Sequence, residues 1–155
     1  MDTVTIRITY PDFTVTHPEY FSPRVKLNRN EQIDREARPK DVYKIFTQHQ
    51  TKEDKVRNIY KPVLTLTQRM KQGERELEWF LNIQMSVPRI LYPSNIYEIV
   101  PQDRNRIFRE LVRILSIMGI ETQAETISES VVTKFHTEKT LSYQMDIQCR
   151  RQFLS

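Results

Sequence analysis

LEWFLNIQMSV, residues 77–87, is the stretch that decides the fold, because polar and apolar side chains alternate along most of it. One face carries Leu81, Ile83, Met85 and Val87, and the other carries Phe80, Asn82, Gln84 and Ser86. A period of two residues is that of a β-strand with one buried face. We therefore expect a strand that sends its aliphatic side chains into the core.

Two further strands are predicted before this one. The segment VLTLT at residues 63–67 predicts its partner, and a glycine-containing turn at residues 70–74 joins the two into an antiparallel hairpin. At the start of the chain, aliphatic residues alternate with threonine and arginine until Pro11; they are Val4, Ile6 and Ile8. This pattern predicts a strand that opens the protein.

One long amphipathic helix is predicted between Asp103 and Met118. Asp103 is a favourable N-cap residue, and Gly119 stands where a helix ends in the left-handed conformation. Apolar residues recur at helical spacing as Ile107, Leu111, Ile114, Leu115 and Met118. Three arginines share the opposite side: Arg106, Arg109 and Arg113. They suit phosphate binding, and they equally suit a solvated helix face.

The alternating residues at 120–127 and 130–143 predict two more strands after the helix. The order is then hairpin, helix and strands. The expected class is α+β, a mainly antiparallel sheet with one long amphipathic helix packed on one face. The 155 residues are expected to form a single domain, with a better organised hairpin–helix–strand unit at residues 62–147.

Residues 17–61 are expected to be less regular, extended with one short helical turn at Val42, Ile45 and Phe46. Basic and aromatic residues alternate between Arg24 and Lys61, as on surfaces that hold single-stranded nucleic acid. Acidic residues are interspersed among them, so a solvated connector explains the same composition.

The composition limits the function classes. The net charge of +4 is compatible with nucleic acid, an acidic protein or an anionic surface. The chain has two glycines, too few for a glycine-rich phosphate-binding loop. The three histidines are too far apart in the sequence to form an HExxH or His-x-His metal motif. Catalysis therefore has no local signature, and we expect no cofactor and no metal site. With one cysteine, no signal peptide and no long apolar run, the chain is expected to be cytoplasmic, without a membrane segment.

Several segments resemble one known family. They are YKPVLTLTQRM, FLNIQMSVPRILYPSNIYEI, LSIMGIETQAETI and VVTKFHTEKTLSY. Together they are similar to the N-terminal half of phage and plasmid rolling-circle replication initiators of the filamentous-phage gene II and X type. The matching residues are Tyr60, Lys61, Pro62, Ser86, Pro88, Arg89, Ile90, Leu91, Asn95, Met118, Gly119, Ile120, His136 and Lys139. The match covers residues 60–143.

The resemblance implies a DNA-replication protein that nicks one strand through a tyrosine and a metal held by a His-x-His strand. This chain has no His-x-His, and none of its seven tyrosines can be assigned as the nucleophile. The expectation is therefore a DNA-binding domain or accessory protein without nicking activity of its own. The nucleic-acid-binding residues expected are Arg89, Arg106, Arg109, Arg113, Lys134, His136 and Lys139. Arg89 is expected in a loop, where Pro88 stops the strand.

A second hypothesis is of another class. A small protein encoded by a mobile element could bind another protein, such as a host factor or an enzyme subunit, through residues 24–61. DNA binding predicts an affinity that falls steeply with salt, whereas protein binding predicts a stable complex and no DNA shift at physiological salt.

Overall fold

The computed structural model describes residues 3–24, 26–27, 29–37, 42–70, 77–93 and 99–136. A six-stranded sheet runs through the molecule in the order β3-β4-β5-β6-β1-β8, and each neighbouring pair is antiparallel. Its strands are β1 (Thr3–Thr9), β3 (Ser22–Pro23), β4 (Val42–Gln48), β5 (Val63–Met70), β6 (Glu78–Met85) and β8 (Val131–His136). The predicted α+β class with a mainly antiparallel sheet is confirmed.

The predicted hairpin is present as β5 and β6, and it forms the centre of the sheet. In its register Leu64 lies beside Ile83 and Leu66 beside Leu81, and all four side chains are buried. The strand expected at the N-terminus is β1, which pairs with the other side of β6 and buries its aliphatic side chains on the same face. The turn expected at residues 70–74 lies mainly outside the described residues.

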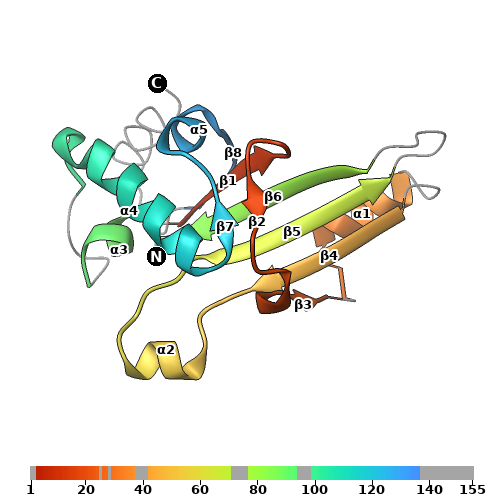
Figure 1. The fold of residues 1–155 in the computed structure, drawn as a ribbon. Helices are drawn as coiled ribbons and strands as arrows, with labels where there is room; N and C mark the ends of the chain where they lie inside the picture. The colour runs from red at the N-terminus through yellow and green to blue at the C-terminus, as the bar shows by residue number, and fades with distance from the viewer. Residues whose placement is uncertain are drawn as a thin grey trace.

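Helix α4 (Arg104–Ile117) covers this apolar face, with the short helices α3 (Val87–Leu91) and α5 (Ala124–Glu129) beside it (Figure 1). Its stripe of Ile107, Leu111, Ile114, Leu115 and Met118 belongs to the main core, as the helical spacing predicted. A 3-10 turn, η2 (Pro101–Asp103), precedes it. No helix in the described part of the chain is both long enough and apolar enough to cross a bilayer.

Gly119 ends α4 in the left-handed conformation, as predicted, with φ of +87°. It leads into β7 (Ile120–Glu121), which pairs with β2 (Thr14–Val15) in a separate two-stranded sheet. A Cβ atom built on Gly119 would lie 2.7 Å from the Cβ of His17, so this position also allows a close approach of two chain segments.

The helical turn expected at Val42, Ile45 and Phe46 is wrong. These residues lie in β4, which pairs with β5 over its whole length. Phe46 packs against the main core, while Ile45 is 5% exposed and lies outside that core cluster. Helix α1 (Arg29–Ala37) lies behind β4 and β5 in Figure 1, so both faces of β4 are covered and no simple alternation appears.

The strand expected at residues 120–127 is wrong beyond its first two residues. β7 ends at Glu121, and α5 follows, burying Ile127 in the core before the chain enters β8. The strand expected at residues 130–143 is present as β8 up to His136, and its remainder lies outside the described residues.

Candidate functional site

Arg89 lies on a helix and not in the loop expected from the sequence. Ser86 is the N-cap of α3, and Pro88 occupies its first turn. Proline is favourable there because its φ angle already suits a helix and the missing N–H would have no partner within the helix. The backbone N–H of Tyr92 donates to Pro88 O at 2.9 Å and closes the turn. Pro88 therefore ends β6 by starting a helix.

A groove runs between α3 and α4. One cavity, of about 270 Å³, is lined by residues of α3, α4 and the connection between α2 (Lys52–Val56) and β5, including Arg89 and Arg113. A second, of about 500 Å³, is lined by Ile90, Leu91, Arg106, Arg109, Glu110 and Arg113. The two share Ile90, Leu91, Glu110 and Arg113, so we treat them as one α3–α4 groove. It brings together four arginines predicted to bind nucleic acid: Arg89, Arg106, Arg109 and Arg113.

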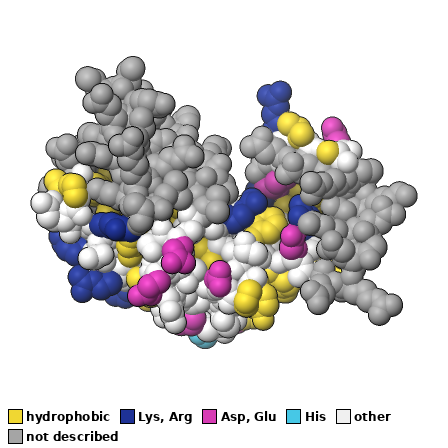
Figure 2. Space-filling view, turned by 90° about the horizontal axis from the view of Figure 1, so that it is seen from above, with side chains coloured by type: hydrophobic (Ala, Val, Ile, Leu, Met, Phe, Trp, Pro, Cys, Tyr) yellow, Lys and Arg dark blue, Asp and Glu magenta, His cyan; other side chains and the backbone are white. Residues whose placement is uncertain are grey.

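Two of these arginines have carboxylate partners. Arg113 donates to Glu110 Oε1 at 2.9 and 2.5 Å, and this hydrogen bond raises the pKa of Arg113. Arg106 lies 3.4 Å from Asp103 Oδ1. Among the described residues, no ion pair forms at Arg89 or Arg109. The groove therefore carries more positive than negative charge, and Figure 2 shows Lys and Arg side chains gathering at the end of the molecule that holds α4.

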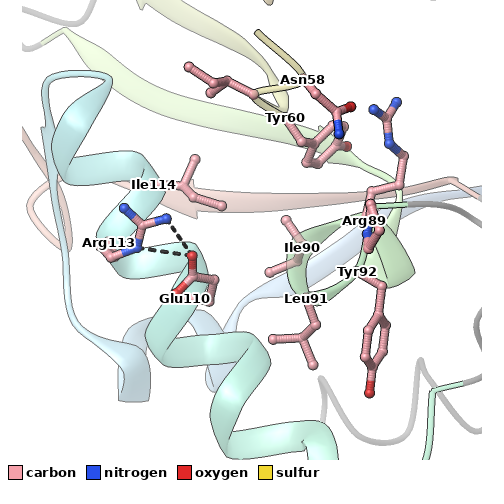
Figure 3. Close-up of a pocket in the computed structure, with 11 residues that line it drawn as sticks. Asn58, Tyr60, Arg89, Ile90, Leu91, Tyr92, Glu110, Arg113 and Ile114 are labelled. Atoms are coloured by element: carbon pink, nitrogen blue, oxygen red, sulfur yellow. Dashed lines mark hydrogen bonds and ion pairs between the residues drawn. The ribbon is translucent and has the colours of Figure 1, made fainter.

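Tyr60 forms one wall of the groove. The guanidinium carbon of Arg89 lies 4.6 Å from the centre of the Tyr60 ring, a cation–π distance. The Tyr60 hydroxyl accepts a hydrogen bond from the backbone N–H of Ser86 at 2.8 Å. Burial raises the pKa of Tyr60, so the hydroxyl stays protonated at neutral pH. Across the groove Ile114 points towards Ile90 (Figure 3).

Asp103 connects α3 to the start of α4 through side-chain hydrogen bonds that differ from those of an ordinary N-cap. It occupies the predicted N-cap position, but its side chain makes no hydrogen bond to the helix backbone. It accepts instead from Val100 N at 3.2 Å and from the Tyr92 hydroxyl at 3.3 Å. Asp103 is 5% exposed. The carboxylate therefore ties the end of α3 to the start of α4, and so sets the position of both walls of the groove.

The remaining predicted residues are Lys134, His136 and Lys139. In the ladder between β8 and β1, Lys134 lies beside Thr5 and His136 beside Thr3. The side chains of β8 and the whole of Lys139 lie outside the described residues. Sequence reasoning in turn missed Glu110, which pairs with Arg113, and the role of Tyr60 as a wall.

Within the described ranges, no group of three or more His, Cys, Asp or Glu residues is arranged to hold a metal ion. The groove chemistry consists of guanidinium groups, aromatic rings and aliphatic side chains. This combination can bind anions and flat rings.

Comparison with models of known protein families, with curated proteins and with solved structures found no match in any of the three.

Proposed function

We propose that this protein binds single-stranded DNA in the α3–α4 groove, as a replication-initiator-like domain or accessory protein of a phage or plasmid, without nicking activity of its own. The observation that carries the proposal is the convergence of four arginines on one groove. The segment that most resembles the initiators, SVPRIL at residues 86–91, includes the whole of α3 and so forms one side of this groove.

The spacing of the arginines suits a strand that follows the helix axis. Arg106 and Arg113 are seven residues apart, which is about 10 Å along an α-helix at 1.5 Å per residue. A stacked strand advances about 3.4 Å per nucleotide, so this length spans about three stacked nucleotides. Guanidinium forks match phosphate oxygens well, and Arg109 has no competing carboxylate among the described residues.

A single strand fits this groove better than a duplex does. The groove combines backbone-binding cations with aromatic and aliphatic walls from Tyr60, Ile90 and Leu91. Positively charged grooves with aromatic walls are typical of proteins that bind single strands without reading base pairs.

The test is a titration of a fluorescently labelled single strand of about 12 nucleotides, a length within the usual site size, followed by anisotropy at several salt concentrations. The double variant Arg106→Gln, Arg109→Gln is expected to lose at least about tenfold in affinity. Its salt slope should fall by about 1.4, because two phosphate contacts are lost and each contributes about 0.7 for a single strand.

The matched control is Arg29→Gln, Arg35→Gln. Both residues are exposed on α1, which lies at the opposite end of the sheet from α4 (Figure 1). This control removes the same charge and should change affinity by less than about twofold, since distant exposed charges are screened by salt. Equal losses in the two double variants, or no binding by the unmodified protein at low salt, would refute the proposal.

The second candidate, a protein-binding module acting through residues 24–61, is favoured by one observation. Apolar side chains are exposed on both helices of that segment, with Ile33 on α1 54% exposed and Val56 on α2 (Lys52–Val56) 86% exposed. A co-purified partner that is lost from an Ile33→Asp, Val56→Asp variant, together with no DNA shift, would support it.

A further inference from the structure

A further cavity, of about 480 Å³, opens at the end of β4, and none of the four arginines lines it. We call it the β4 pocket. Its lining comes from η1 (Pro18–Tyr20), β3, β4, the segments just before and after α2, and the last turn of α4. The lining residues are Tyr20, Ser22, Thr47, Gln48, His49, Thr51, Lys61 and Ile117. Segments far apart in the sequence therefore build one pocket.

Gln48 is the unusual residue of this pocket. Its amide oxygen Oε1 is buried and has no hydrogen-bond donor among the described residues. A buried acceptor without a partner costs free energy, so such groups are rare and point to a missing partner. The terminal torsion of a glutamine side chain is soft, and the amide can therefore turn its oxygen towards a donor inside the pocket.

The rest of the lining suits a flat heteroaromatic ring. Tyr20 and Ile117 are 47% and 57% exposed and offer an aromatic and an aliphatic wall. The hydroxyls of Ser22 and Thr47 lie in the paired strands β3 and β4. The Lys61 side chain also lines the pocket, and its ammonium pairs with Asp54 Oδ2 at 3.2 Å. An aromatic wall, an aliphatic wall, hydroxyl groups and an amide oxygen that lacks a donor match a nucleobase.

The β4 pocket adjoins the α3–α4 groove. Tyr60 lines the groove and Lys61, the next residue, lines the pocket. On α4, Arg113 and Ile114 line the groove, and Ile117 lines the pocket about one helical turn further on. A strand whose phosphates follow Arg106, Arg109 and Arg113 therefore reaches the pocket at the end of α4.

We propose that the β4 pocket receives one unstacked adenine base of the strand bound in the α3–α4 groove, with the Gln48 amide pairing to its amino group and ring nitrogen. A glutamine amide offers an acceptor and a donor side by side, which is the pattern that adenine complements. Single-stranded bases are free to leave the stack and enter such pockets. This inference rests on the proposed function, because that function supplies the DNA strand. The match between the pocket residues and a base does not depend on it.

The experiment compares two labelled strands of the same length, all thymidine and thymidine with one central deoxyadenosine. The unmodified protein should bind the adenine-containing strand at least about five times more tightly, the lower limit of the discrimination expected for one good bidentate contact. Gln48→Leu keeps the side-chain volume but has no amide, and it should bind both strands with the weaker affinity and an unchanged salt slope. Ile117→Ala, at an exposed position, should also reduce the preference.

The outcomes separate this inference from the proposed function. If the strands bind equally well, or if Gln48→Leu keeps the preference, the base pocket is refuted while the groove stands. If no strand binds, adenosine monophosphate is titrated alone and followed by NMR. Amide shifts at Thr47 and His49 that Gln48→Leu abolishes would identify a free-nucleotide pocket, and no shifts would refute the pocket too. A melting temperature of Gln48→Leu at or above that of the unmodified protein establishes that the variant is folded.

Discussion

The guanidinium of Arg89 lies over the ring of Tyr60, 4.6 Å from its centre, and the hydroxyl of the same tyrosine accepts from Ser86 N. The Tyr60 side chain thus contacts both Ser86, the residue before α3, and Arg89, which lies on that helix. Tyr60 precedes β5, so the contact joins the central hairpin to the helix that follows it. The groove depends on this junction, because Arg89 has no ion pair among the described residues.

Tyr60→Phe and Tyr60→Leu should separate the two contacts. Phenylalanine keeps the ring and loses the hydroxyl acceptor, so we expect the free energy of unfolding in urea to fall by about 1 kcal/mol with little change in DNA affinity. Leucine also loses the cation–π contact, which contributes about 0.5–2 kcal/mol, and should weaken DNA binding because Arg89 is no longer held. Equal affinities for the two variants would show that Tyr60 does not position Arg89.

The pH dependence of stability gives an independent check on Tyr60. Burial raises the pKa of its hydroxyl above 10.0, the ordinary value for tyrosine. The folded protein therefore holds this proton more tightly than the unfolded chain, and stability is lost as the pH rises through the folded pKa. Urea unfolding at increasing alkaline pH should show a smaller loss for Tyr60→Phe than for the unmodified protein. The same loss in both proteins would assign the alkaline transition to other groups.

Glu110→Gln should strengthen DNA binding. Glu110 pairs with Arg113 inside the groove, so its removal frees one guanidinium group and takes away one negative charge. Affinity for a single strand should rise on the order of threefold at low salt, and the gain should shrink as salt is added. Stability should change by less than about 1 kcal/mol because the ion pair is partly exposed.

The control for Glu110→Gln is Glu53→Gln. Glu53 on α2 pairs at 2.8 Å with Arg57, the C-cap of that helix, and α2 projects away from the sheet (Figure 1). The two variants have the same net charge, so a general charge effect would raise the affinity of both. A gain confined to Glu110→Gln would locate the effect in the α3–α4 groove.

Local periodicity predicted those elements whose two faces differ. The hairpin and α4 each bury one face, so alternation in β6 and the stripe from Ile107 to Met118 were readable from the sequence. Gly119 was predictable because a left-handed residue at a helix end favours glycine. The same helical period predicted that Arg106, Arg109 and Arg113 share one exposed face of α4, and in the structure these residues line one groove.

Elements fixed by tertiary contacts were not predictable in the same way. β4 is covered on both faces, so apolar side chains are needed on both of them. Ile45 and Phe46 are therefore neighbours in the sequence, and polar and apolar residues do not alternate. Pro88 was interpreted as the end of a strand, although the same residue is equally suited to the first turn of α3. The β4 pocket draws Tyr20, Gln48 and Ile117 from distant segments, and no local pattern connects them.

Acid should loosen the α2 arm, by which we mean residues 51–61, before the rest of the fold. The hydrogen bond from the Thr51 backbone N–H, with help from Lys61, lowers the pKa of Asp54. A lowered pKa means that the contribution of Asp54 is present above the unfolded value and is lost as the pH falls through the folded value. The amides of Asp54 and Ile59 form hydrogen bonds within the arm, so their protection factors against hydrogen exchange, corrected for the intrinsic rate at each pH, should fall in acid. Asp54→Asn should exchange faster at neutral pH and lose this acid step, and an unchanged acid step in that variant would contradict the assignment.

Gly119→Ala should be among the most destabilising single changes at the end of α4. Alanine at a φ of +87° costs about 1–2 kcal/mol, and its Cβ would meet the Cβ of His17 at 2.7 Å. The two segments cannot simply separate, because Thr16 N donates to Gly119 O at 2.8 Å. We expect a loss of about 2 kcal/mol or more in urea unfolding. His17→Gly removes the Cβ atom that clashes with the introduced alanine. In the double variant the loss of unfolding free energy due to the clash should therefore be recovered, while the loss due to the left-handed backbone conformation should remain. Strictly additive losses would show that the two Cβ positions do not interact, and that the backbone conformation alone requires glycine here.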